Sequence, residues 1–218
     1  MPTELDLTSR RTGGRAARYG ILGSLALFGV CIAVLLSALT TTAAASMRPR
    51  TNVTKYGISF VLPKGWTQVS LSPGDIGGML GKASSESASM KSFLTSQALA
   101  AAKQGLKFFA IAPGGNANVN TGIYAGTSSL DGLDVSAKLG VSSIGGKNVH
   151  TKRVHFGFGN AIEATYLLPL NGSAAPVHGT QFYVSHNGHT YITTFSSAVE
   201  TVEASAASAM MPTWRFSK

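Results

Sequence analysis

The chain has 218 residues, enough for one ordinary domain and a further segment. Only 12% of the residues are charged, and the 18 lysines and arginines outnumber the 9 aspartates and glutamates. These basic residues are scattered along the sequence, which argues against a nucleic-acid-binding protein and favours a mildly cationic, solvated surface. The one cysteine, Cys31, excludes a disulfide within the chain.

An apolar run near the N-terminus, Gly20–Leu39, contains 20 residues and no charge. As a helix it reaches about 30 Å, the thickness of the hydrocarbon core of a bilayer, and a spanning segment must be helical to satisfy its backbone. The run therefore predicts one transmembrane helix. Four arginines precede it and place the N-terminus in the cytoplasm and the rest of the chain outside the plasma membrane; they are Arg10, Arg11, Arg15 and Arg18.

Three other roles of this segment stay open. Ala43-Ala44-Ala45 is a candidate cleavage site for a signal peptide, although the apolar run is longer than is usual for one. Cys31 follows Val30 and so lacks the small residues of a lipoprotein box. Ser9-Arg10-Arg11 has the twin arginine of an export signal, but Thr12-Gly13-Gly14 does not continue that motif.

One face of the predicted helix carries a small residue at every fourth position: Gly29, Ala33 and Ser37. Small side chains let another helix approach closely, so this face is a candidate docking site for a membrane partner. We expect four segments in the chain. They are a cytoplasmic basic tail at 1–19, the transmembrane helix at 20–42, a linker at 43–54 and an extracytoplasmic domain at 55–218.

The first part of the predicted domain mixes strands, loops and helices. Tyr56–Leu62 alternates apolar and polar residues, and Pro63-Lys64-Gly65 turns the chain so that Trp66–Leu71 returns antiparallel to it. Glu86–Gln104 has an apolar stripe at helical spacing and stops at Gly105. The other elements, in chain order, are a loop at Ser72–Lys82, a strand at Leu106–Ile111, a loop at Ala112–Asn120, a strand at Gly122–Ala125 and a helix at Leu130–Leu139.

A hairpin is expected from Val149–Gly157 and Ala161–Leu168, joined by Phe158-Gly159-Asn160. A three-residue loop sets Val154 opposite Ala164, and likewise Phe156 opposite Ile162, which matches apolar residues with apolar residues. This register favours the three-residue loop over a two-residue loop, which would set Val154 opposite Glu163.

A second hairpin is expected around Asn187-Gly188, between strands at Thr180–His186 and His189–Ser196. A capping box, Ser197-x-x-Glu200, then opens a helix that ends before Pro212. Its apolar stripe comprises Val199, Val202, Ala206, Ala209 and Met210. Trp214 and Phe216 alternate on a short closing strand, and the sum is an α+β domain, an antiparallel sheet with three helices packed on it.

The run Tyr56–Trp66 (YGISFVLPKGW) resembles the start of PsbP-like domains, an aromatic residue and Gly-x-Ser-Phe followed by Pro-x-Gly-Trp. The end is also similar, with two strands around an Asn-Gly turn, a helix and Trp214-Arg215-Phe216. The resemblance, to the actinobacterial envelope-protein branch of this superfamily, covers roughly Tyr56–Phe216. No motif matches in Ser72–Gly146, and a lipid-acceptor box is lacking, which favours a transmembrane anchor.

The resemblance implies an α/β/α sandwich with helices on both faces of the sheet, and a non-catalytic role. Members of the superfamily include an extrinsic subunit of the oxygen-evolving photosystem, a small-GTPase release factor and envelope lipoproteins. They bind protein partners or, in some cases, small or lipidic ligands. Because one fold hosts many functions, this is an analogy.

The residues themselves offer two weak polar sites. His186 and His189 flank the second turn and should point to one face, but two imidazoles lack the further ligands of a metal site. In the register above, His155 lies opposite Glu163, which indicates a cross-strand ion pair. No catalytic or nucleotide-binding motif is recognisable, so we expect no enzyme, no cofactor and no metal. Trp66 and Trp214 are expected to pack in the core.

The sequence therefore predicts a non-enzymatic, membrane-anchored accessory or assembly subunit that binds an integral membrane protein or membrane complex. The alternative is a module that binds an envelope lipid or another apolar small ligand at the membrane surface. Three alanines of the predicted helix leave room for such a cavity: Ala98, Ala101 and Ala102.

Overall fold

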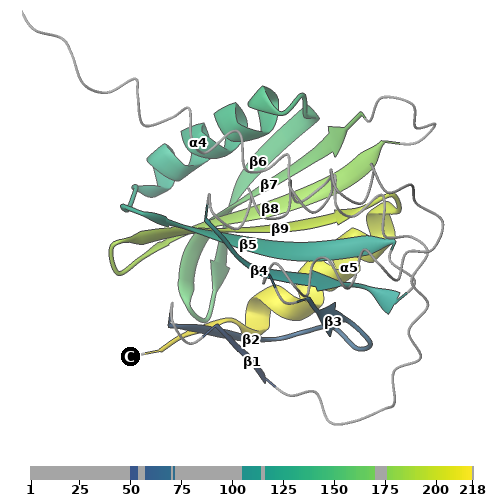
Figure 1. Ribbon diagram of the computed structural model, residues 1–218. Coiled ribbons are helices and arrows are strands. Elements are labelled where there is room, and N and C mark those ends of the chain that lie inside the picture. Colours follow the sequence, from purple (N-terminus) through teal and green to yellow (C-terminus); the bar gives the residue numbers. More distant parts are fainter. Residues whose placement is uncertain are drawn as a thin grey trace, which may run out of the picture.

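The computed structural model describes residues 50–53, 57–69, 71, 105–113, 116–169 and 176–217. The described strands form two antiparallel sheets (Figure 1). The larger has seven strands in the spatial order β3-β4-β5-β9-β8-β7-β6, and the smaller has three in the order β1-β2-β10. The strands are β1 Arg50–Val53, β2 Ile58–Val61, β3 Thr67–Gln68, β4 Leu106–Ile111, β5 Ala117–Ala125, β6 Lys147–Phe156, β7 Gly159–Leu168, β8 Val177–His186, β9 His189–Ser197 and β10 Arg215–Phe216.

Two described α-helices, α4 (Leu130–Ser143) and α5 (Glu200–Met210), lie on opposite faces of the larger sheet. Leu133 and Ala137 of α4 pack in one cluster with Tyr183 of β8, whereas α5 packs in another cluster with Phe182. Because neighbouring residues of a strand point to opposite faces, the two helices must be on opposite sides. Figure 1 shows α4 above and α5 below the strands, and this confirms the α+β class.

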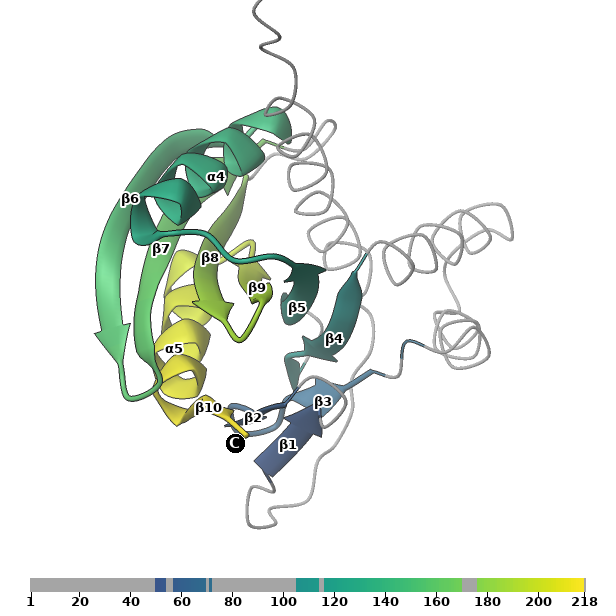
Figure 2. The same ribbon diagram turned by 90° about the vertical axis from the view of Figure 1, so that its left-hand side faces the viewer.

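The main core lies on the α5 face, between α5, the larger sheet and β2. Trp214, which is 1% exposed, stacks on Phe60 with a ring-centroid separation of 6.2 Å, and Phe60 meets Phe108 edge-on at 4.7 Å. A 3₁₀ turn, η4 (Met211–Thr213), leads from α5 to β10, which lies beside β2 in Figure 2. The expected core position of Trp214 is confirmed, and half-buried Trp66 packs against the same core.

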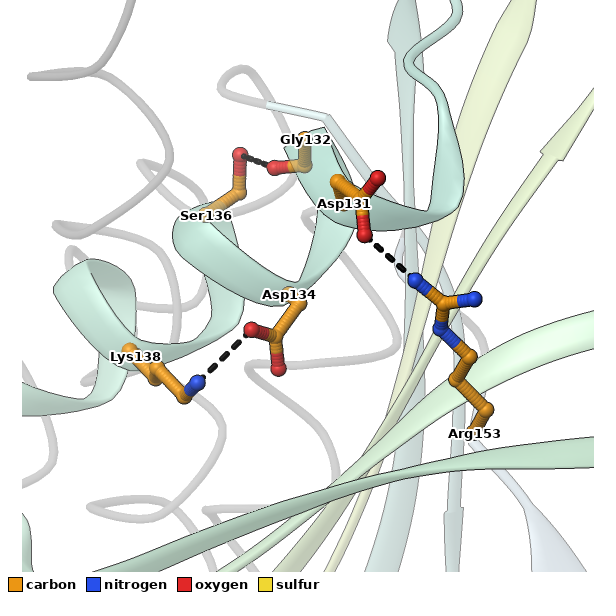
Figure 3. Close-up of polar contacts among 6 residues, drawn as sticks. All are labelled: Asp131, Gly132, Asp134, Ser136, Lys138 and Arg153. Carbon is orange, nitrogen blue, oxygen red and sulfur yellow. Dashed lines mark hydrogen bonds and ion pairs between the residues drawn. The ribbon is translucent and has the colours of Figure 1, made fainter.

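α4 is held by local polar contacts (Figure 3). The Ser129 hydroxyl caps its N-terminus by accepting a hydrogen bond from the Gly132 amide at 3.2 Å. Lys138 pairs with Asp134 one turn away at 2.7 Å, and Asp131 pairs with Arg153 of β6. The helix continues past Gly140, where a stop was expected, and the chain turns at Gly145, whose φ is 83°.

The expected pairing of Trp66–Leu71 with Tyr56–Leu62 is wrong. β2 is paired on one side by β1, which lies in the predicted linker, and on the other side by β10. No edge of β2 is left for the following segment, so β3 joins the larger sheet beside β4.

A second correction concerns Ala112–Asn120, which was expected to be a loop. β5 begins at Ala117, and its polar residues Asn118 and Asn120 are 0% and 5% exposed. The strand is central, between β4 and β9, and is buried on both faces. Polar residues that resembled a loop are therefore part of the sheet's interior.

The first hairpin also differs from the expected register. A two-residue turn, Gly157-Phe158, sets Phe156 opposite Gly159 and Val154 opposite Ala161. β7 starts at Gly159, whose φ of 128° is readily adopted only by glycine. Since β7 has apolar residues on both faces, matching Val154 with Ala164 did not identify the register.

The second hairpin and the last helix are confirmed as elements. Asn187 and Gly188 have φ values of 43° and 79°, as the expected tight turn requires. The capping box is wrong, because Ser197 still belongs to β9 and its hydroxyl accepts from the Val199 amide at 3.0 Å. The α5 residues that are buried are Glu203, Ala206, Ala207 and Met210.

Several expectations lie outside the described residues: the tail at 1–19, the transmembrane segment Gly20–Leu39 with its face of Gly29, Ala33 and Ser37, the loop Ser72–Lys82 and the third helix at Glu86–Gln104. Within the ranges that are described, no helix has the length and apolar character needed to cross a membrane.

Candidate functional site

An open groove of about 720 Å³ runs between α5 and the outer strands of the larger sheet. Of the described helices, α5 packs mainly over β8, β9 and β5, so neither described helix covers much of the same face of β6 and β7. The floor of the groove is made by side chains of β6, β7 and β8, and its wall by the outer side of α5.

The groove has walls of opposite charge. His150 and Lys152 come from β6, and Glu200 and Glu203 come from α5. Between them, Glu163 of β7 lies directly opposite Lys152, with the Nζ and Oε1 atoms 3.0 Å apart. The arrangement suits a ligand that is itself polarised, with acidic groups toward β6 and basic groups toward α5.

Glu203 is the most deeply buried carboxylate in the groove, at 4% exposure. Burial raises its pKa, a hydrogen bond with the Thr180 hydroxyl lowers it, and the carboxylates of Glu200 and Glu163 raise it further. Its Oε1 atom is buried and has no hydrogen-bond partner. The sequence did carry a signal for this residue, since positions 203, 206, 207 and 210 form an i, i+3, i+4, i+7 stripe.

Apolar side chains fill much of the remaining floor and wall. They are Val154, Phe156, Leu167, Phe182, Ala204 and Ala207. A groove of this composition can bind an aliphatic stem or an apolar side chain while the charged groups fix its orientation.

β6 borders the groove and is an edge strand of the larger sheet. It is ten residues long and mostly exposed, and it carries no acidic residue. Its basic and imidazole side chains are Lys147, His150, Lys152, Arg153 and His155. An exposed edge strand has unpaired backbone groups, and basic side chains are a common way to keep such an edge from pairing indiscriminately.

The predicted ion pair of His155 with Glu163 is wrong, because the register moves both residues. His155 lies opposite Asn160, and its Nδ1 atom is 2.8 Å from the Asn160 Oδ1 atom. Glu163 pairs with Lys152 instead. Both residues still line the groove, but they do not meet there as a pair.

His186 and His189 lie directly opposite each other across the second turn, so they share a face as expected. Their rings have different neighbours. His186 stacks on Phe216 with a centroid separation of 3.8 Å, whereas the Nδ1 atom of His189 is 3.0 Å from the Asn187 carbonyl oxygen. Among the residues described, no group of three or more His, Cys, Asp or Glu side chains is arranged to hold a metal ion.

A second hollow, of about 430 Å³, lies on the other side of α5. Lys64 and Trp66 border it from the segment between β2 and β3, and Ala206 and Ala209 border it from the helix. It is smaller than the groove and has a single charged side chain among its lining residues.

The opposite face of the larger sheet carries a buried polar row. Asn118, Ser196, Gly179 and Tyr166 are successive cross-strand neighbours on β5, β9, β8 and β7. The Tyr166 ring covers Gly179, where an added Cβ would come within 2.3 Å of it. Four polar atoms on this face are buried without a hydrogen-bond partner: Asn118 Nδ2, Gln181 Nε2, Tyr166 OH and Ser196 Oγ.

No family model and no curated protein sequence matches the chain. Solved structures with similarity to it include the cyanobacterial PsbP protein (CyanoP) from Synechocystis, at 13% identity and a TM-score of 0.46, covering 82% of this chain and 98% of that one. The Ran-binding protein Mog1p from Saccharomyces cerevisiae has 9% identity and a TM-score of 0.45, covering 79% and 96%.

A protein from Bacteroides thetaiotaomicron has 11% identity and a TM-score of 0.45. The match covers 74% of this chain but only 46% of that one, so the present chain spans less than half of its length. A PsbP protein and Mog1p are thus among the solved structures to which the chain is similar.

Proposed function

We propose that the chain is a non-enzymatic accessory or assembly subunit that binds a membrane protein complex, and that the groove beside α5 is the contact site. The observation that carries the proposal is the sheet face over β6 and β7 that the described helices leave largely uncovered, next to an exposed edge strand. A strand or helix of a partner can complete the layer there, lying alongside α5.

The charges on the two walls support a polarised partner segment. Toward β6 it meets His150 and Lys152, and toward α5 it meets Glu200 and Glu203. Complementary charges of this kind fix register and orientation and discourage other partners. The apolar floor, with Phe156 and Phe182, supplies area that is removed from water on binding.

Site-specific photo-cross-linking in the membrane tests this contact. A photoreactive residue is placed at His150 in the groove or, as a control, at Val135, which is 47% exposed on α4. We expect a membrane protein to be captured from His150 and not from Val135 in the full chain with its N-terminus intact. Identical capture from both positions, or none from His150, would overturn the proposed site.

A second candidate function is the binding of an envelope lipid or another apolar small ligand. The apolar part of the groove favours it, especially Val154, Leu167 and Ala207. The alanine face expected at Ala98, Ala101 and Ala102 lies outside the described residues. Native mass spectrometry of the chain extracted from membranes checks this alternative. A bound lipid that is lost in Ala207→Trp supports it, and an empty protein excludes it.

A further inference from the structure

Glu203 combines two features that rarely occur together in a carboxylate. It is 4% exposed, and its Oε1 atom lacks a hydrogen-bond partner. A buried polar atom without a partner costs roughly 1–3 kcal/mol, and more if it is charged. A hydrogen bond donated to this oxygen would therefore contribute more free energy to binding than the same bond at the protein surface.

Two of the basic side chains that face the groove from the described elements have acidic partners other than Glu203. Lys152 of β6 pairs with Glu163 of β7 at 3.0 Å, and His178 of β8, when protonated, faces Glu200 at 3.9 Å. His150 of β6 is exposed on the far wall. No described cation forms an ion pair with Glu203, and its carboxylate neighbours, Glu163 and Glu200, disfavour its charged form.

The surroundings of Glu203 define the shape of what would bind there. Ala204 and Ala207 of α5 and Phe182 of β8 line the same groove and present apolar surface. An aliphatic stem can lie against these side chains while a charged head meets the carboxylate, as lysine and arginine side chains commonly do.

We propose that the groove binds a cationic group on an aliphatic stem, such as a lysine side chain of the partner or a free alkylamine, with its ammonium group at Glu203. This inference rests on the proposed function and names the chemistry that the partner segment presents toward α5. A charge-assisted hydrogen bond forms between the ammonium and the carboxylate, and a protonated carboxyl group releases its proton to water when the cation binds.

The binding test uses the purified chain and two probes, Nα-acetyl-lysine N-methylamide and pentylamine, with the uncharged norleucine analogue as control. We expect both cations to bind and to lower the pKa of Glu203. This pKa is measured by ¹³C NMR of the carboxyl carbon. Glu203→Gln should weaken binding about tenfold or more, because a charged hydrogen bond is lost. Asp134→Asn is the matched control, since that carboxylate is on α4, outside the groove, where it pairs with Lys138.

Equal binding by the Glu203→Gln variant, or equal binding of the norleucine analogue, overturns the inference. Thermal unfolding of both variants shows that any loss is not a loss of fold. The two sources of the cation are distinguished by competition with the photo-cross-linked partner. Displacement by the lysine probe identifies a partner side chain, and tighter binding of pentylamine with no displacement identifies a free amine.

The outcome is separable from that of the proposed function. If the chain with the photoreactive residue at His150 captures the same membrane protein with equal yield when Glu203 is replaced by glutamine, and both probes bind that variant as tightly as the wild type, the partner site stands and the cation site does not. If neither His150 capture nor probe binding is seen, both fail. If the probes bind but no membrane protein is captured, the cation site is supported and the proposed partner contact is overturned.

Discussion

Lys152 of β6 lies directly opposite Glu163 of β7, and the two side chains form an ion pair with an Nζ–Oε1 distance of 3.0 Å. The pair crosses the floor of the groove, close to where its basic and acidic walls meet. Glu163 is the more protected partner, with 16% of its side chain exposed against 66% for Lys152. The ion pair therefore depends on the register of the hairpin. It also contributes both of its charges to the groove.

A double-mutant cycle checks this register. Lys152→Ala and Glu163→Ala should show a coupling free energy of about 0.2–1 kcal/mol in urea unfolding, because they are a direct cross-strand pair with partial exposure. His155→Ala is the control, and its effect should add to that of Glu163→Ala within error. Coupling of Glu163 to His155 instead of Lys152 would restore the three-residue loop.

The hairpin register could not be predicted because the sequence pattern of β7 is ambiguous. Ile162 and Ala164 face α4, while Ala161 packs in the core beside α5, so both faces of the strand are apolar. A period of two identifies a register only when one face is polar. The Asn187-Gly188 turn was predictable for the opposite reason, since its two residues favour the positive φ values that a tight hairpin needs.

The groove was only partly predictable. His155 and Glu163 were identified as polar residues of interest, and both line the groove, but the pairing between them was wrong. Glu203 was missed because the expected stripe of α5 was built from apolar residues alone, whereas the buried stripe includes this carboxylate. The groove between β6, β7 and α5 also depends on which strands α5 covers. Helical periodicity predicts the buried face of a helix but not the strands on which it packs.

The second turn offers a test of backbone conformation. Gly188 has a φ of 79°, and an added Cβ would meet nothing within 4 Å. Gly188→Ala therefore destabilises the fold only through the cost of holding alanine at a positive φ. We expect a loss of about 1–2 kcal/mol in the free energy of unfolding. Gly157 of the first turn is the matched control, because it is a turn glycine without a positive φ. Its replacement by alanine should change stability little, and equal losses at both turns would contradict the assignment.

The buried polar row predicts an unusual stabilisation. The Ser196 hydroxyl is 0% exposed and lacks a hydrogen-bond partner, so Ser196→Ala removes a desolvation penalty and should leave stability unchanged or raise it by about 1 kcal/mol. Thr193→Val on the same strand is the contrasting variant. It deprives the buried Thr121 hydroxyl of its partner at 3.1 Å and should cost about 1–3 kcal/mol. A clear loss in Ser196→Ala would mean that the hydroxyl has a bound partner in solution.

Glu203 makes stability depend on pH with a predictable sign. Burial raises its folded-state pKa above the ordinary value of 4.5, so the folded chain holds this proton more tightly than the unfolded chain. Its contribution is most favourable below that ordinary value and declines as the pH rises through the folded-state pKa. The charged and titratable residues that line the groove with it are Glu163, Glu200, His178, Lys152, His150, His155 and Tyr166. Urea unfolding of the wild type and Glu203→Gln between about pH 4 and pH 8 isolates this residue, since the other groups are shared. We expect the stability of the wild type to fall relative to that of the variant as the pH rises; a constant difference would show that Glu203 is solvated or paired when the chain is folded.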